Sequence, residues 1–115
     1  MRLPAAALTS LALLLSVPPA AYAACYENLG QTGCPDRETF SKADLSMLSC
    51  QNLWHLRNSI YNDHGYCFRT KAAKDVFDNS DCYENDASQL RFNRHERANI
   101  DRIVRIEKER GCRAP

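Results

Sequence analysis

The chain has 115 residues, enough for one small domain, and its 15 basic residues stand against 14 acidic ones. This near balance gives no sign of a nucleic-acid-binding protein. Six cysteines in so short a chain, with no Cys-x-x-Cys pair among them, indicate three structural disulfides rather than a zinc site.

The N-terminal segment has the layout of a secretory signal peptide. Arg2 supplies a positive charge, residues 3–17 are apolar, and Ala21-Tyr22-Ala23 has small residues at the two positions that signal peptidase reads. The apolar stretch is shorter than the roughly 20 residues that cross a bilayer. We predict cleavage after Ala23, export to the bacterial periplasm or beyond, and no stable membrane insertion afterwards. The alternative, a lipoprotein anchored through Cys25, would leave an odd number of cysteines.

An irregular N-terminal arm is expected over residues 24–43. This segment contains Gly30, Gly33 and Pro35 and shows no lasting hydrophobic period. Because all six cysteines lie beyond residue 23, the exported part carries every predicted disulfide. We expect a helical domain to follow the arm, over residues 44–115.

The first predicted helix begins near Asp44, which is a good N-cap residue, and ends at about His64, before Gly65. Its apolar positions have helical spacing: Leu45, Leu48, Leu53, Leu56 and Ile60.

Two further helices are predicted. A short one begins after Thr70 and carries Ala73, Val76 and Phe77. A longer one begins after Asn93, with Glu96 in the capping-box position and Gly111 at its end. Its apolar positions are Ile100, Ile103, Val104 and Ile106. No segment alternates like a strand, so the predicted fold is all-α, a small disulfide-stapled bundle of about three helices.

This arrangement constrains the disulfides. Along one helix over residues 45–64, Cys50 and Cys67 would lie roughly 20 Å or more apart, beyond the ~7 Å Cα separation that a disulfide allows. If the first and third helices are antiparallel, Cys50 comes close to Cys112. The predicted pairs are therefore Cys50 with Cys112, Cys67 with Cys82, and Cys25 with Cys34.

The segment from Leu53 to Phe68 resembles the signature of the YARHG domain, a small bacterial extracytoplasmic module named for its Tyr-Ala-Arg-His-Gly string. The matching positions are Leu56, Arg57, Asn58, Ile60, Tyr61, His64, Gly65 and Phe68, and further on Phe77, Tyr83, Glu96, Asn99 and Ile100. Asn62 and Asp63 replace the central Ala-Arg, and Cys82-Tyr83 stands where the family often has Trp-Tyr followed by Pro. The resemblance covers about residues 50–110 and indicates a divergent, cysteine-rich branch. It implies an envelope module suspected of binding cell-wall or surface components, and it transfers no catalytic residue.

Eight residues are candidates for a binding site: Trp54, Arg57, Asn58, Tyr61, His64, Tyr66, Glu96 and Asn99. Arg57, Tyr61 and His64 share one helix face, which Glu96 and Asn99 can meet from the last helix. In the structural interpretation, which we prefer, Arg57 pairs with Glu96 while Asn58 and Asn99 bond backbone groups. In the functional interpretation the same residues line a ligand pocket. Likewise, Trp54 and Tyr66 either complete the core or stack on a sugar ring.

Catalytic and metal chemistry find little support in the sequence. His64 is accompanied by no Gly-x-Ser-x-Gly, free catalytic cysteine or His-Glu-x-x-His motif. His55, His64 and His95 have no metal-ligand spacing, and the acidic loop of Asp78, Asp81, Glu84 and Asp86 does not follow the EF-hand pattern. We therefore expect no cofactor, no metal and no enzyme.

The function predicted from the sequence is an exported, non-enzymatic binding module of the bacterial cell envelope. Its expected partner is a cell-wall glycan or peptide, or another envelope protein, and no nucleic acid. One alternative is a small inhibitor or chaperone of an exported protein, which predicts an exposed apolar patch. The other is a hydrolase centred on His64, which requires an open pocket with a second titratable group.

Overall fold

Four α-helices and one short 3-10 helix make up the regular structure of the computed structural model, which describes residues 25–115. They are α1 (Lys42–Ser46), α2 (Cys50–Asp63), α3 (Lys71–Val76), the 3-10 helix η1 (Ala87–Gln89) and α4 (Arg94–Arg110). No strand occurs among the described residues, and the all-α, disulfide-stapled prediction is confirmed. The predicted signal peptide over residues 1–23 and its cleavage site lie outside this range.

The helix predicted from Asp44 to His64 is wrong in one respect, because the chain is interrupted at residues 47–49. Asp44 is not the cap. The side chain of Ser41 accepts a hydrogen bond from the Asp44 amide and caps α1, and Ser49 does the same for α2 at Asn52. Each serine satisfies a backbone N–H that a helix leaves unpaired at its start, which explains why one helix becomes two.

The other helix ends follow the expected capping chemistry. Thr70 caps α3, and Asn93 forms the predicted capping box with Glu96 at the start of α4. Gly111 ends α4 in the left-handed conformation, with a φ of 66°. Such a conformation costs glycine little because it has no Cβ atom.

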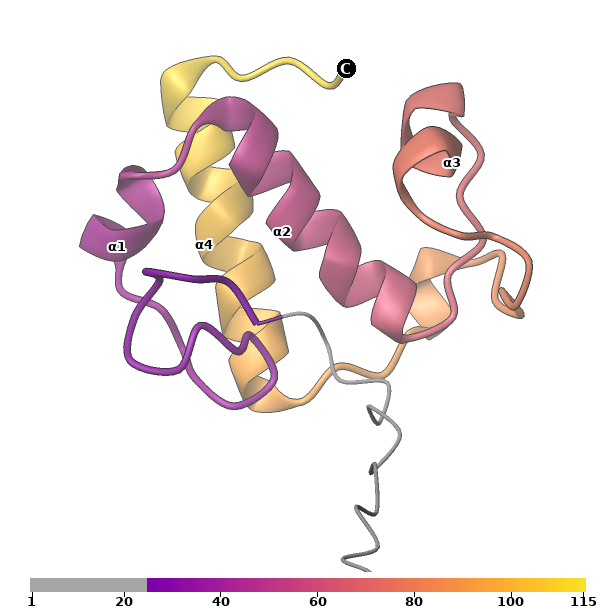
Figure 1. Cartoon of the computed structure of the whole chain (residues 1–115), viewed down its shortest axis with the longest axis horizontal. Helices are drawn as coiled ribbons and strands as arrows, with labels where there is room; N and C mark the ends of the chain where they lie inside the picture. Colours follow the sequence, from indigo (N-terminus) through magenta and orange to yellow (C-terminus); the bar gives the residue numbers. More distant parts are fainter. Residues whose placement is uncertain (1–24) are drawn as a thin grey trace, which may run out of the picture.

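The two long helices, α2 and α4, form the centre of the fold (Figure 1). α1 and the N-terminal arm lie on one side of this pair, and α3 lies on the other (Figure 1). The aliphatic cluster joins the arm, α1, α2 and α4 and consists of Leu29, Phe40, Leu45, Leu53, Leu56, Ile103 and Ile106. The arm is thus part of the core, since Phe40 is fully buried.

A second, aromatic cluster lies between α2 and α3 and consists of Trp54, Phe68, Ala73 and Phe77. The rings of Phe68 and Phe77 are stacked with their centroids 5.0 Å apart. Tyr61 and Tyr66 pack against this cluster while staying partly exposed.

Three disulfides link Cys25 to Cys34, Cys50 to Cys112, and Cys67 to Cys82, as the sequence predicted. Cys50 is the first residue of α2 and Cys112 follows the end of α4, so this bond ties the two helices as an antiparallel pair. Three disulfides indicate an oxidising compartment. Among residues 25–115, no helix has both the length and the apolar character that crossing a membrane requires.

Candidate binding groove

The eight residues predicted as candidates do not form one site. Five of them, Trp54, Arg57, Asn58, Tyr61 and Tyr66, line a groove beside α3. His64 and Glu96 bond one another where α2 ends and α4 begins. Asn99 faces the N-terminal arm. The structure therefore separates a groove from two structural links.

The groove lies between α2 and the segment that leads into α3, and has a volume of about 400 Å³. Its principal side chains are Trp54, Arg57, Asn58, Tyr61, Tyr66 and Arg69. Trp54 and Asn58 are mostly buried, with 9% and 7% of their surface exposed, while Tyr61 and Tyr66 are half-buried. The groove is thus a hollow with an aromatic lining and polar groups beside it.

Helical spacing brings the α2 residues of the groove together. Residues 54, 57, 58 and 61 are three or four positions apart, so their side chains project from one face of α2. Tyr66 comes from the turn after α2, and its ring meets that of Tyr61 edge to face at 5.7 Å. Asn58 donates to the carbonyl of Trp54 one turn earlier, at 2.8 Å, so its side chain is held against its own helix.

The segment opposite α2 belongs to a hairpin over residues 67–82, which contains α3. The disulfide of Cys67 with Cys82 closes it, and Asn79 both accepts from the amide and donates to the carbonyl of Phe68, each at 2.9 Å. Arg69 follows directly and donates from Nη2 to the carbonyl of Asn85 at 3.2 Å. These bonds fix the wall of the groove that α2 does not supply.

Arg57 does not pair with Glu96, so that prediction is wrong. Its Nε and Nη2 atoms donate to the two carboxylate oxygens of Glu107, at 2.8 and 3.1 Å. This bidentate pair is largely shielded from solvent, with 22% and 15% of the two side chains exposed. Such a fork holds the guanidinium group in one orientation and leaves its Nη1 atom free of the ion pair.

Glu96 instead accepts from His64, whose Nε2 atom donates to Oε2 at 2.7 Å. The other oxygen of Glu96 accepts from the amide of Asn93 in the capping box. The ring of Phe92 meets His64 edge to face at 5.0 Å. His64 therefore joins the last turn of α2 to the first turn of α4.

Gly65 makes a sharp turn directly after this link. Its φ is 77°, in the region that favours glycine, and a Cβ atom there would lie only 2.1 Å from the ring of Tyr83. The amides of Tyr83 and Glu84 both donate to its carbonyl, at 2.9 and 3.0 Å. The turn thus holds Tyr83 and Glu84, which follow Cys82, against the end of α2.

The family model of the YARHG domain matches residues 35–108. The chain belongs to the YARHG family. No curated protein and no solved structure matches the chain. The match begins earlier than the resemblance over residues 50–110 and includes the last part of the arm, residues 35–43, consistent with the place of Phe40 in the core.

In this YARHG domain the residues at the family string have different structural positions. Tyr61 lines the groove and stacks on Phe92 with centroids 5.4 Å apart, His64 joins the helix ends, and Gly65 makes the turn. The YARHG domain is a small domain of extracellular type, in agreement with its three disulfides.

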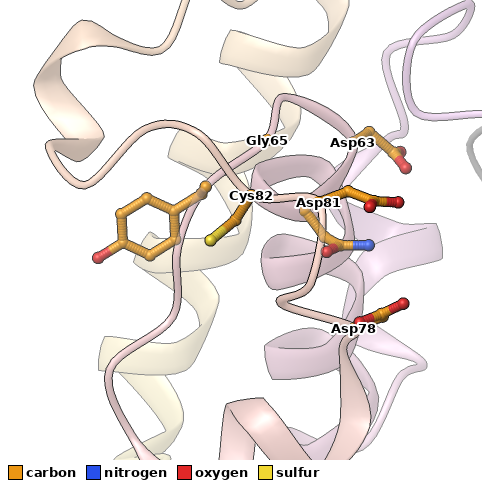
Figure 2. A pocket seen from close by; sticks show the side chains of 7 residues that line it. Asp63, Gly65, Asp78, Asp81 and Cys82 are labelled. Atoms are coloured by element: carbon orange, nitrogen blue, oxygen red, sulfur yellow. The ribbon is translucent and has the colours of Figure 1, made fainter.

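The YARHG domain also has an acidic hollow, with a volume of about 300 Å³, and Tyr66 is one of its lining residues too (Figure 2). Figure 2 shows the carboxylates of Asp63, Asp78 and Asp81 projecting toward the same side. Asp63 is exposed as a residue, yet partial burial of its carboxyl group raises its pKa to about 6; Glu96 and Asp36 add to the effect and His64 opposes it. Three carboxylates without a lysine or arginine among the lining residues make this hollow strongly negative.

Asn99 locks the arm of the YARHG domain onto α4. It is fully buried, its Oδ1 atom accepts from the amide of Phe40 at 2.8 Å, and its Nδ2 atom donates to the carbonyls of Pro35 and Glu38 at 3.0 and 2.8 Å. Within the arm, amides of Gln31 and Thr32 donate to the Glu38 carboxylate and lower its pKa. Asn99 is thus a structural link and does not reach the groove.

The remaining histidines of the YARHG domain are separated from His64. Nδ1 of His55 bonds the Tyr26 hydroxyl, and burial lowers the pKa of His55. Nδ1 of His95 lies 2.7 Å from the Thr39 hydroxyl. Within residues 25–115, no three His, Cys, Asp or Glu side chains are placed to share a metal ion. Asp86 of the acidic loop caps η1 through Ser88, so it serves the backbone.

Two residues important to the groove and its surroundings were missed from the sequence, Arg69 and Glu107. Arg69 follows the Cys67-Phe68 pair, and the predicted disulfide with Cys82 already folds this segment back. Glu107 is signalled by the disulfide of Cys50 with Cys112, because that bond sets the register of the antiparallel helices. Neither residue stands out in composition or spacing alone.

Proposed function

We propose that this YARHG protein is an exported, non-enzymatic binding module of the bacterial cell envelope, and that its groove holds a cell-wall glycan. The observation that carries the proposal is the groove itself, where Tyr61 and Tyr66 are partly exposed beside Arg57 and Arg69. Its volume of about 400 Å³ lies within the ~300–1,000 Å³ that is typical of small-ligand sites.

The chemistry of the lining suits a sugar. Aromatic rings offer flat apolar faces against which the C–H faces of a pyranose can pack, and they lose little conformational freedom on binding. Arg57, Asn58 and Arg69 place hydrogen-bonding groups around those rings, where hydroxyl and acetamido groups need partners. A combination of apolar faces with a few polar groups is what orients a ligand in a pocket.

We propose a non-enzymatic module because the ionisable side chains near His64 already form hydrogen bonds within the protein. The imidazole of His64 bonds Glu96, which is also occupied by the capping box, so the pair joins helix ends. A hollow of about 240 Å³ beside His64 contains Glu84, but the Glu84 carboxylate accepts from the Asp86 amide. These bonds favour a structural role for His64 and Glu84 over acid–base catalysis, in which both would act on one substrate atom.

A protein partner, as for an inhibitor or chaperone, has less support. The exposed large apolar side chains are Met47, Val76 and Tyr83, which come from three different segments of the described chain. Recognition by a protein usually uses a contiguous apolar patch. The proposal further includes export through the signal peptide over residues 1–23 with cleavage after Ala23, residence in the periplasm or outside the cell, no nucleic acid and no membrane insertion.

The test is co-sedimentation of the oxidised protein, expressed from the full chain in an exporting host, with purified bacterial sacculi over a salt series. Tyr66→Leu removes the groove ring but keeps apolar bulk, and Tyr83→Leu is the matched control because Tyr83 is 75% exposed and lies outside the groove. We expect binding that persists at moderate salt and is about tenfold weaker in Tyr66→Leu alone, equivalent to ~1.4 kcal/mol.

The proposal is overturned if the native protein does not sediment with sacculi at low salt, or if both leucine variants bind like the native protein. Circular dichroism and thermal unfolding of each variant separate a loss of binding from a loss of fold. An equal loss in both variants would place the binding surface outside the groove.

A further inference from the structure

We infer that the groove selects a glycan that carries a carboxylate, an acidic sugar, over a neutral glycan of the same length. This inference rests on the proposed function and specifies its ligand class. It is drawn from the distribution of charge around the groove rather than from the aromatic rings, which any sugar can use.

The lining of the groove contains two guanidinium groups, from Arg57 and Arg69, and no carboxylate side chain. The neighbouring hollow has the opposite composition, with three aspartates and no lysine or arginine. Tyr66 lines both hollows and so marks the boundary between them. Because charges are segregated across a single ring, the groove attracts an anionic group that the acidic hollow repels.

Arg69 is the principal partner for the anion. It is exposed and uses only Nη2 in its bond to the Asn85 carbonyl. Its Nε and Nη1 atoms remain for a carboxylate, and a guanidinium fork matches the two oxygens of a carboxylate. Hydrogen bonds from Ser88 are the main cause that lowers the pKa of Asp86, and the charge of Arg69 adds a smaller contribution, so Asp86 is a nearby but weakly coupled counter-charge.

Arg57 has a supporting place. Glu107 compensates much of its charge through the bidentate bond, but that bond also holds the guanidinium group still at the edge of the groove. Its Nη1 atom can then donate to a ligand oxygen without first being ordered, which reduces the entropy lost on binding.

The groove also has room for more than one sugar ring. Past Arg57 it continues into a second, shallower hollow of about 560 Å³, which shares Arg57 and Ala114 with the first and contains Lys108 and also Glu107, whose carboxylate is held by Arg57. Three cations therefore follow one path, from Arg69 past Arg57 to Lys108. An acidic oligosaccharide can lie along this path and end at Tyr66, because the acidic hollow opposes its extension there.

The test is isothermal titration of the oxidised protein with three trimers: trigalacturonate, which carries carboxylates, chitotriose, which is neutral, and a glycerol phosphate trimer. Arg69→Gln removes the proposed partner, and Arg94→Gln is the matched control, since Arg94 is an exposed arginine outside the groove. We expect trigalacturonate to bind about tenfold tighter than chitotriose, and this preference to disappear in Arg69→Gln alone.

Equal binding of trigalacturonate and chitotriose overturns the inference while leaving the proposed function in place. Equal loss in the two glutamine variants also overturns it, since the attraction would then be a general effect of net charge. Tight binding of the phosphate trimer assigns the cations to phosphate polymers instead. If no trimer binds, the inference fails, and sedimentation with sacculi then decides separately whether the proposed function survives.

Discussion

The two hydrophobic clusters on either side of α2 differ in what they are made of and in what holds them together. The aliphatic cluster draws on the arm, α1, α2 and α4, and most of its members are fully buried. The aromatic cluster joins α2 to a hairpin closed by the disulfide of Cys67 with Cys82, and its buried members retain 3–9% exposure. Only the aromatic cluster borders the groove. The aliphatic side of α2 is thus the more deeply buried one, and the aromatic side is the one where we propose that a ligand binds.

The largest effect on the free energy of unfolding is expected at Asn99, whose hydrogen bonds hold the arm against α4 on the aliphatic side. Asn99→Ala leaves the Phe40 amide and the Pro35 and Glu38 carbonyls without partners in a buried position. At ~1–3 kcal/mol for each unsatisfied buried group, partly relieved by water, we expect a loss of about 3–5 kcal/mol in the free energy of unfolding. Chemical denaturation of the oxidised protein measures it.

Asn58→Ala is the matched control for this substitution, because Asn58 is also buried but bonds only a carbonyl of its own helix. We expect it to cost about 1 kcal/mol. Similar costs for the two alanine variants would contradict the view that Asn99 links the arm to α4.

An intermediate effect is expected on the aromatic side. Replacing both Cys67 and Cys82 by serine opens a loop with a sequence separation of 15 and should cost about 2–3 kcal/mol. The hairpin, and with it Arg69 and Tyr66, should loosen while the aliphatic cluster stays folded. We therefore expect sedimentation with sacculi to be lost while protection of α2 and α4 amides from hydrogen exchange is largely kept.

The matched comparison is the double serine variant of Cys25 and Cys34, whose disulfide lies in the arm. That variant should keep its binding to sacculi. If opening the arm abolishes binding as completely as opening the hairpin, the two sides of α2 are not independent.

The smallest effect concerns Asp63, at the edge of the acidic hollow. Its folded-state pKa of about 6 lies above the ~3.9 of an unfolded aspartate, so the folded protein binds this proton more tightly. Stability from this group is therefore present at low pH and is lost as pH rises through about 6. Asp63→Asn should raise the melting temperature at pH 7.5 by up to about 5 °C, since solvent exposure limits the effect to less than ~1 kcal/mol.

Thermal unfolding from pH 4 to pH 8 checks this expectation, and the gain should disappear toward pH 4. Asp101→Asn, at an exposed position of α4, is the control and should show no such pH dependence. A gain that is constant across the pH range would assign the effect to something other than the proton on Asp63.

Much of the fold follows from local chemistry that is visible in the sequence. Gly65 and Gly111 end helices where left-handed backbone is needed, and the capping box of Asn93 and Glu96 begins α4. Helix length excludes a bond between Cys50 and Cys67, and an antiparallel arrangement of the long helices then predicts the three observed pairs. The break at residues 47–49 was missed, although Ser49 is a good N-cap residue for a helix that begins at Cys50. The cap of α1 is Ser41 and not Asp44, although both residue types favour this position.

The partners of Arg57 and His64 were open to prediction by register. With Cys50 opposite Cys112, each step along α2 is matched by one step back along α4, so Arg57, seven residues on, faces residues near 105. That places Glu107 within reach and leaves Glu96 for His64, as observed. The groove was harder to foresee, since Tyr66 and Arg69 reach it through an irregular hairpin whose path depends on tertiary contacts.

The disulfide of Cys50 with Cys112 encloses the part of the YARHG domain that follows α1, and the ring closed by Cys67 and Cys82 is nested inside it. A protease that cuts one peptide bond anywhere between residues 50 and 112 therefore releases no fragment, because the two new ends stay covalently joined. A copy nicked at one bond in this range therefore remains one covalent molecule, with α2 still tied to the end of α4.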